Sequence, residues 1–147
     1  MGDRKRGEGI MRKVFRTPLG WAGVAVTGAG VARIVLPKGD RQSAERELEA
    51  ETIEPAGEGT PGKMSGLLDR AVTLLQKYFS GNNVTFDLPL DTRYYSAFQQ
   101  AAWKACVAIP FGETRSYAWV AKRIGRPKAA RAVGQAMGAN PVPVLVP

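Results

Sequence analysis

The C-terminal third of the chain concentrates side chains that could bind a polyanion. From residue 91 onward, 8 Lys and Arg stand against 2 Asp and Glu, and the whole chain of 147 residues has a net charge of +8. No acidic residue interrupts six cations between residues 115 and 131, which are Arg115, Lys122, Arg123, Arg126, Lys128 and Arg131. A local excess of this kind attracts nucleic acid, and an ordinary solvated basic surface is the alternative.

Other reactive side chains are few. Cys106 is the only cysteine and the chain has no histidine, so an internal disulfide is impossible and a metal site would lack ligands. Cys106 shares the apolar face of a predicted helix with Phe98, Ala102 and Ile109, and this helix must end before Pro110. Because a thiol in apolar surroundings stays protonated and unreactive, we expect Cys106 to belong to the core.

The cations are placed on a predicted pair of helices. Ser116 can cap a helix that continues through Ile124 and ends at Gly125, and a second helix is predicted from Pro127 to about Gly138. A helix, a short turn with glycine and another helix are the sequence form of a helix-turn-helix.

The second helix of this pair, "PKAARAVGQAMGAN", is dominated by alanine and glycine. Arg131 and Gln135 are nearly its only polar side chains that could contact base edges, which is too few for reading bases in the major groove. Small side chains allow a close approach to the narrow minor groove, with one arginine long enough to enter the base stack. Tight packing between helices would also favour the alanines and Gly134, and both interpretations stay open.

Residues 1–91 are typical of an α+β domain. Three β-rich runs between Arg12 and Pro37 predict an antiparallel meander with turns at residues 18–20 and 28–30. A polar helix is predicted over residues 40–51 and a loop over 54–63, and apolar spacing from Ser65 predicts a helix that ends with Gly81 as its C-cap. "NVTFDLPLD", residues 83–91, predicts one more strand. Residues 92–147 are expected to form a second, mostly helical domain.

No stretch approaches the roughly 20 apolar residues of a membrane span, and no apolar segment follows the basic N-terminus. The sequence therefore predicts a soluble, cytoplasmic protein.

Several motifs in the second half carry a family resemblance. The stretch from Phe98 to Pro147 contains "IPFGET", a Ser-Tyr pair before a helix, "RAVGQAM" and "NPVPVLVP". In order and spacing it closely resembles the DNA-binding and active-site domain of O6-alkylguanine-DNA alkyltransferases. "TPLG", "YFSG" and "LPLD" resemble the first domain of that family. The resemblance implies an α+β protein with an RNase H-like domain over residues 1–91 and a winged-helix-like helix-turn-helix domain over residues 92–147.

The resemblance also implies roles for individual residues. An enzyme that acts on O6 of a stacked guanine must extrude the nucleotide and fill the gap. Arg131 matches the intercalating arginine, and Tyr117 matches the tyrosine that crowds the 3′ phosphate and bonds the flipped base. Asn140 matches the asparagine that fixes the active-site turn, while Met137 and Pro143 match residues near the alkyl pocket. Further positions at the DNA face are Phe98, Gln99, Ser116, Lys128, Ala130, Gly134 and Gln135. Trp103 is expected to pack in the core.

The reaction implied by the resemblance is a single transfer of an alkyl group from guanine O6 in double-stranded DNA to a protein cysteine. It needs no cofactor, and a monomer is expected. In the family the chain continues with Pro-Cys-His-Arg, whereas this sequence ends at Pro147. We expect the acceptor directly after Pro147, as cysteine or as selenocysteine encoded by a UGA codon, and we expect the 147 residues alone to be inactive. A fragment, a nonsense mutation or a decayed gene are the alternatives.

Two other functions remain open at this point. Alkyltransferase-like proteins lack the acceptor cysteine but still bind alkylguanine in DNA and mark it for other repair. A helix-turn-helix transcription regulator is the second alternative, and the alanine-rich second helix disfavours it, because few of its side chains can read a specific sequence.

Overall fold

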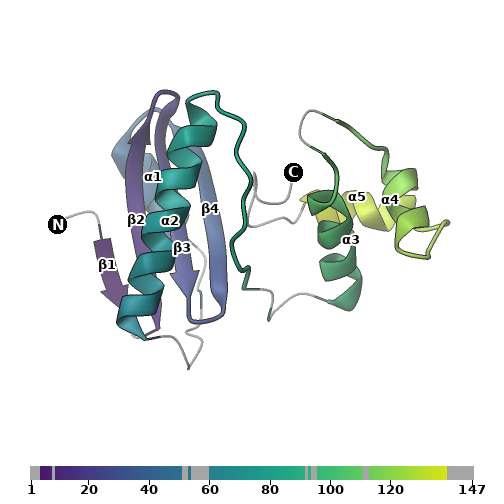
Figure 1. The fold of residues 1–147 in the computed structure, drawn as a ribbon, viewed down its shortest axis with the longest axis horizontal. Coiled ribbons are helices and arrows are strands. Elements are labelled where there is room, and N and C mark those ends of the chain that lie inside the picture. Colours follow the sequence, from purple (N-terminus) through teal and green to yellow (C-terminus); the bar gives the residue numbers. More distant parts are fainter. Residues whose placement is uncertain are drawn as a thin grey trace. The chain divides into compact units, whose positions relative to one another are not determined.

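The computed structural model describes residues 4–7, 9–50, 53, 60–91, 93, 96–110 and 113–138. The chain divides into two compact units, Met1–Asp91 and Thr92–Pro147. Among the described residues, the first unit has a sheet and two helices, and the second has three helices (Figure 1). The α+β class expected from the sequence is confirmed.

The sheet of the first unit is an antiparallel meander of four strands in the order β1-β2-β3-β4. The strands are β1 (Arg4–Gly7), β2 (Ile10–Thr17), β3 (Gly20–Thr27) and β4 (Gly30–Lys38). The predicted three-stranded meander corresponds to β2, β3 and β4, and β1 is an additional edge strand. Its sequence, RKRG, has no alternation of apolar and polar residues, so periodicity could not reveal it.

The turns of the β2–β3 hairpin and the β3–β4 hairpin are formed by the same hydrogen bond and the same type of residue. Thr17 ends β2 and Thr27 ends β3, and each hydroxyl accepts the backbone N–H of the residue two positions further on, at 3.1 Å. The glycines that follow, Gly20 and Gly30, have φ of +125° and +140°, a region that disfavours every other residue. The repeated Thr-x-x-Gly spacing thus fixes both turns.

Helices cover both faces of this sheet. In β3, the neighbouring residues Val24, Ala25 and Val26 are all fully buried, although their side chains alternate between faces. The helix α1 (Arg41–Glu49) packs Ala44 and Leu48 against Val14, Ala25 and Val35. The helix α2 (Pro61–Phe79) contacts β2 and β3 and buries Met64, Leu68, Ala71, Val72 and Leu75.

The ends of α1 and α2 are set by local hydrogen bonds. Asp40 caps α1, and bonds from the backbone N–H and the hydroxyl of Ser43 lower the pKa of its carboxyl group. The helix α2 begins at Pro61, inside the segment predicted as a loop, because the Thr60 side chain accepts the N–H of Lys63 and proline suits the first helical position. Its predicted end is confirmed, with Gly81 at φ +92° just beyond the C-cap.

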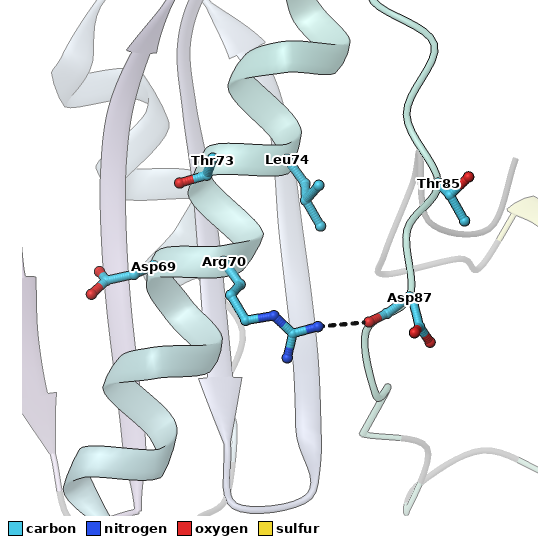
Figure 2. A pocket seen from close by; sticks show the side chains of 6 residues that line it. All are labelled: Asp69, Arg70, Thr73, Leu74, Thr85 and Asp87. Carbon is cyan, nitrogen blue, oxygen red and sulfur yellow. Dashed lines mark hydrogen bonds between the residues drawn. The ribbon is translucent and has the colours of Figure 1, made fainter.

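The strand predicted over residues 83–91 is wrong. Only one parallel bridge forms there, between Leu90 and Val31, with bonds from Val31 N to the Pro89 carbonyl and from Asp91 N to the Val31 carbonyl. Pro89 has no N–H to offer to a ladder. The Asp87 carbonyl accepts a bond from the Arg70 side chain of α2 at 3.0 Å, as Figure 2 shows, and so is not paired with a strand.

The described part of the second unit contains α3 (Ala97–Val107), α4 (Tyr117–Arg123) and α5 (Ala130–Gly138). The predicted helix before Pro110 and the Ser116 cap of α4 are confirmed. The helix α5 begins at Ala130 rather than at Pro127, because the N–H of Ala129 bonds the Arg126 carbonyl in a tight turn. The core of this unit is formed by Ala102, Trp103, Ala105, Cys106, Val120, Ala121, Val133 and Ala136.

Candidate nucleic-acid interface

The first residues of α4 define one side of the candidate interface. The Ser116 hydroxyl accepts the N–H of Trp119 at 3.0 Å, which fixes the start of the helix and places Tyr117 at its first position. The Tyr117 side chain is 52% exposed, an unusual degree for a large aromatic residue. Its ring lies directly against α5: a Cβ atom added to Gly134 would be 3.0 Å from the ring Cε2 atom. The two helices therefore meet at Tyr117 and Gly134.

The opposite face of α5 is anchored in the core. Val133 and Ala136 are buried, and the indole N–H of Trp103 donates to the Ala136 carbonyl at 2.9 Å. The Met137 sulfur lies 3.3 Å from the Cys106 Sγ atom of α3. These contacts fix the rotation of α5 about its axis, so the residues on its other side are presented outward.

The outward side of α5 carries four of the residues predicted from the sequence. Arg131 and Gln135 are exposed, and they are four residues apart on one helix face. Ala130 and Gly134 are half-buried and form the adjacent strip of small residues, next to Tyr117. Gly134 therefore packs against the Tyr117 side chain, as the packing interpretation expects, and Arg131 is exposed. The approach of the small residues to the minor groove stays a prediction.

Exposed cations are frequent in α4 and in the turn that leads to α5. Lys122, Arg123, Arg126 and Lys128 are all exposed, and Glu113 is the only acidic residue of the sequence after Asp91. Glu113 pairs with Arg115 at 2.9 Å. The surface of α4 and α5 is therefore strongly positive, as a surface that attracts phosphate groups must be.

Sequence reasoning missed the role of Trp119. The guanidinium groups of Arg115 and Arg123 lie 5.4 and 5.9 Å from the centre of its ring, within the range of cation-π attraction. The spacing of Arg115, Trp119 and Arg123 at every fourth position could have indicated this stacking. It holds two cations of the basic surface in place.

Gln99 has a structural task that the sequence did not suggest. Its side-chain oxygen accepts the N–H of Ser96, while the Ser96 hydroxyl accepts the N–H of Gln99, so the pair forms a capping box at the start of α3. Phe98, its neighbour, is half-buried. No contact described in the structure joins Phe98 or Gln99 to Tyr117 or Arg131.

Cys106 belongs to the core, as predicted. Its side chain is 4% exposed, and burial raises the pKa of the thiol above its usual value. A protonated, enclosed thiol is a poor nucleophile. Trp103 is 3% exposed, which confirms the prediction that it packs in the core.

Two predicted site residues, Asn140 and Pro143, lie outside the described residues. In the part of the chain that the structure describes, no three His, Cys, Asp or Glu residues group as metal ligands would. Among the described helices, none is long and apolar enough to cross a membrane.

The first unit has a shallow pocket between α2 and the segment that follows it (Figure 2). It is lined by Asp69, Arg70, Thr73, Leu74, Thr85 and Asp87. Its one guanidinium already bonds a backbone carbonyl, and two aspartates are among the lining residues. The pocket offers no positive surface comparable with that of α4 and α5.

Comparisons with known proteins agree on one family. A family model described as "6-O-methylguanine DNA methyltransferase, DNA binding domain" matches residues 97–147. The constitutive methylated-DNA--protein-cysteine methyltransferase of Bacillus subtilis is 40% identical over 131 residues, which cover 89% of this chain and 73% of that protein. The corresponding Mycobacterium tuberculosis protein is 51% identical over 87 residues, which cover 59% of this chain and 50% of the relative. The match thus spans about half the length of the mycobacterial relative.

Solved structures show the same relationship. The crystal structure of Mycobacterium tuberculosis O6-methylguanine methyltransferase superposes with a TM-score of 0.65 at 39% identity, and covers 94% of this chain and 75% of that chain. The structure of Mycobacterium tuberculosis OGT in complex with DNA has the same TM-score at 38% identity, with coverages of 92% and 74%. The fold, the exposed helix pair and these matches together show that the chain belongs to the methylated-DNA--protein-cysteine methyltransferase family.

Proposed function

We propose that this chain binds double-stranded DNA that contains O6-alkylguanine and takes part in its repair by direct removal of the alkyl group. The observation that carries the proposal is the exposed surface on which Tyr117 of α4 meets Gly134 of α5, with Arg131 exposed three residues earlier on α5. The match of residues 97–147 to a DNA-binding domain and the likeness to a protein solved with DNA support it.

The shape of this surface suits the minor groove. Small residues on α5 let the helix backbone come close to DNA, and Arg131, the second residue of this helix, is exposed. We propose that the Arg131 guanidinium occupies the space of an extruded guanine. Tyr117, whose ring lies against Gly134, presses on the 3′ phosphate and turns the nucleotide outward.

The surrounding cations hold the duplex through its phosphates, with Lys128 in the turn between the helices as one of them. Such contacts set register and carry no sequence information. Ser116 acts through the helix cap, because it fixes the position of Tyr117. Roles for Phe98, Gln99 and Gln135 at the DNA face, and for Met137, Asn140 and Pro143 near an alkyl pocket, stay predictions.

The chemical step in this proposal is an in-line displacement. The carbon of the alkyl group forms a bond to the acceptor atom while its bond to guanine O6 breaks, and the guanine is left intact. We do not assign this step to Cys106, since the thiol is enclosed between α3 and α5 and burial raises its pKa. The acceptor expected next to Pro147 stays a prediction.

We further infer that residues 1–91 are the RNase H-like domain of the family and residues 92–147 its helix-turn-helix domain, and that the protein acts as a cytoplasmic monomer. The division into compact units at Asp91 supports the first inference. Sedimentation equilibrium of the chain with and without a short duplex would test the second, and a stable dimer would contradict it.

Binding to three DNA duplexes tests the proposed function. Fluorescence anisotropy would compare a duplex with one O6-methylguanine, the same duplex with guanine, and an operator-like palindrome. We expect the tightest binding to the O6-methylguanine duplex. Preference for the palindrome would favour a transcription regulator, and equal affinity for all three would leave only non-specific DNA binding.

A further inference from the structure

Gly134 lies inside α5 at a position where the backbone does not need glycine. Gly134 is not among the five described glycines that have a positive φ, and the helix continues through it from Ala130 to Gly138. Glycine in a helix interior costs about 0.5–1 kcal/mol relative to alanine. A steric reason must therefore account for the missing side chain.

The structure provides that reason. A Cβ atom at Gly134 would lie 3.0 Å from Cε2, 3.2 Å from Cδ2 and 3.8 Å from Cζ of Tyr117, and these are its nearest neighbours. Contacts of 3.0–3.2 Å are too close for two carbon atoms, whose best separation is about 3.5–4.0 Å. One edge of the tyrosine ring thus rests on the bare backbone of α5.

The ring is held from two sides. The Ser116 cap fixes the backbone of Tyr117, and Gly134 forms the floor beneath its ring, while about half of the side chain stays exposed. A methyl group at Gly134 would push the Tyr117 ring away from the α5 backbone. Because the outer side of the ring is open, the ring would be displaced toward solvent and the helices would stay packed.

We propose that Gly134 is a positioning residue. Because it has no side chain, the Tyr117 ring lies directly against the α5 backbone, and this contact sets the position from which the ring acts on DNA. The inference rests on the proposed function for its consequence in DNA binding, whereas the seating of the ring is a property of the free protein. Gly134 would then act through Tyr117 and not through a contact of its own with DNA.

Gly66 provides a matched control. It lies in the interior of α2, it is exposed, and a Cβ atom there would meet nothing within 4 Å. Both Gly66→Ala and Gly134→Ala exchange a helix-interior glycine for alanine, so both gain helix propensity. Only Gly134→Ala should move a tyrosine.

The first measurement needs no DNA. In the full chain labelled with 3-fluorotyrosine, the four tyrosines give four ¹⁹F resonances, and Tyr117→Phe identifies the one from Tyr117. We expect Gly134→Ala to shift this resonance and leave the other three in place, and Gly66→Ala to shift none. An unchanged Tyr117 resonance in Gly134→Ala would overturn the inference.

The second measurement is a double-mutant cycle on duplexes with O6-methylguanine or guanine. We expect Tyr117→Ala to reduce the preference for O6-methylguanine about tenfold, the scale of one hydrogen bond to a charged group, and Gly134→Ala to reduce it about threefold or more. In the Tyr117→Ala background, Gly134→Ala should change it less than twofold, since residues that act through one another are not additive.

The two possible failures are distinguishable. If Gly134→Ala weakens binding equally with and without Tyr117, Gly134 contacts DNA itself and the positioning role is wrong. If the parent chain shows no preference for O6-methylguanine, the proposed function fails, and the ¹⁹F shift alone then decides whether Gly134 seats the ring.

Discussion

At the scale of single residues, the structure separates side chains that could react or bind from those that only pack. Cys106 is enclosed, whereas Tyr117 and Arg131 are exposed on the helix pair. Chemistry that involves DNA is therefore expected at the surface of α4 and α5, and none is expected at the only thiol of the sequence.

Cys106 should accept no methyl group. Incubation with a duplex that carries labelled O6-methylguanine should leave Cys106 unlabelled, because burial excludes DNA from the thiol and keeps it protonated. Mass spectrometry of the tryptic peptide measures this, and iodoacetamide in urea is the control that the thiol itself is intact. Stoichiometric label on Cys106 would refute the assignment to the core.

The raised pKa of the Cys106 thiol predicts that the stability of the fold depends on pH. Its pKa is higher in the folded chain than the usual value of 9.0, so above about pH 9 the unfolded chain loses its proton first. The contribution of the protonated Cys106 thiol to the free energy of unfolding is complete below about pH 9 and is lost as the pH rises. Urea unfolding should show a steeper alkaline decline for the parent than for Cys106→Ala, and parallel curves would contradict the shift.

Arg131 and Lys128 should have separable effects on DNA. We expect Lys128→Gln to weaken binding to every duplex and to lower the slope of log K against log salt by about one, while Lys63→Gln at the start of α2 serves as control. Arg131→Ala should reduce base extrusion, measured by 2-aminopurine fluorescence in a duplex, far more than binding to a single strand. Equal losses on duplex and single strand would place Arg131 outside the flipping step.

At the scale of elements, caps determine where helices begin. Thr60 caps α2 through its bond to the Lys63 N–H, so Thr60→Ala should lower the free energy of unfolding by about 1 kcal/mol. Thr73, exposed in the middle of the same helix, is the matched control, and Thr73→Ala should have little effect. Urea denaturation measures both, and similar losses would show that the cap is not the cause.

At the scale of the whole molecule, a buried side-chain hydrogen bond helps to tie the segment after α2 to the sheet. The Thr27 hydroxyl donates to the Asp91 carboxylate at 2.7 Å, and both residues are buried. Asp91 is the last residue of the first unit, and its N–H also bonds the Val31 carbonyl. The end of this unit is thus fixed at the turn between β3 and β4.

Loss of this bond should destabilise the first unit. Asp91→Ala leaves the Thr27 hydroxyl without its acceptor, which costs about 1–3 kcal/mol for a buried group. Asp87→Ala is the control, because Asp87 is exposed and it is its backbone carbonyl that bonds Arg70. Thermal unfolding should show a clear fall in Tm for Asp91→Ala only, and equal shifts in both variants would refute the role of the buried bond.

The sequence by itself determined the features that are encoded within a few neighbouring residues. The hairpins from Ile10 to Lys38, the helix that ends before Gly81 and the Ser116 cap all follow from short-range periodicity, turn residues and capping side chains. The burial of Cys106 followed in the same way from the apolar face of one helix.

Only the tertiary structure decided the features that join residues distant in the chain. The segment at residues 83–91 has the composition of a strand, yet it forms no ladder. Its backbone instead accepts one bond from the Arg70 side chain and forms one isolated bridge with Val31. The seat of Tyr117 on Gly134 is of the same kind, because 17 positions separate the two residues and only the packing of α4 on α5 brings them together. Local propensity cannot specify such contacts, since they depend on which surfaces remain available once the helices and strands have packed.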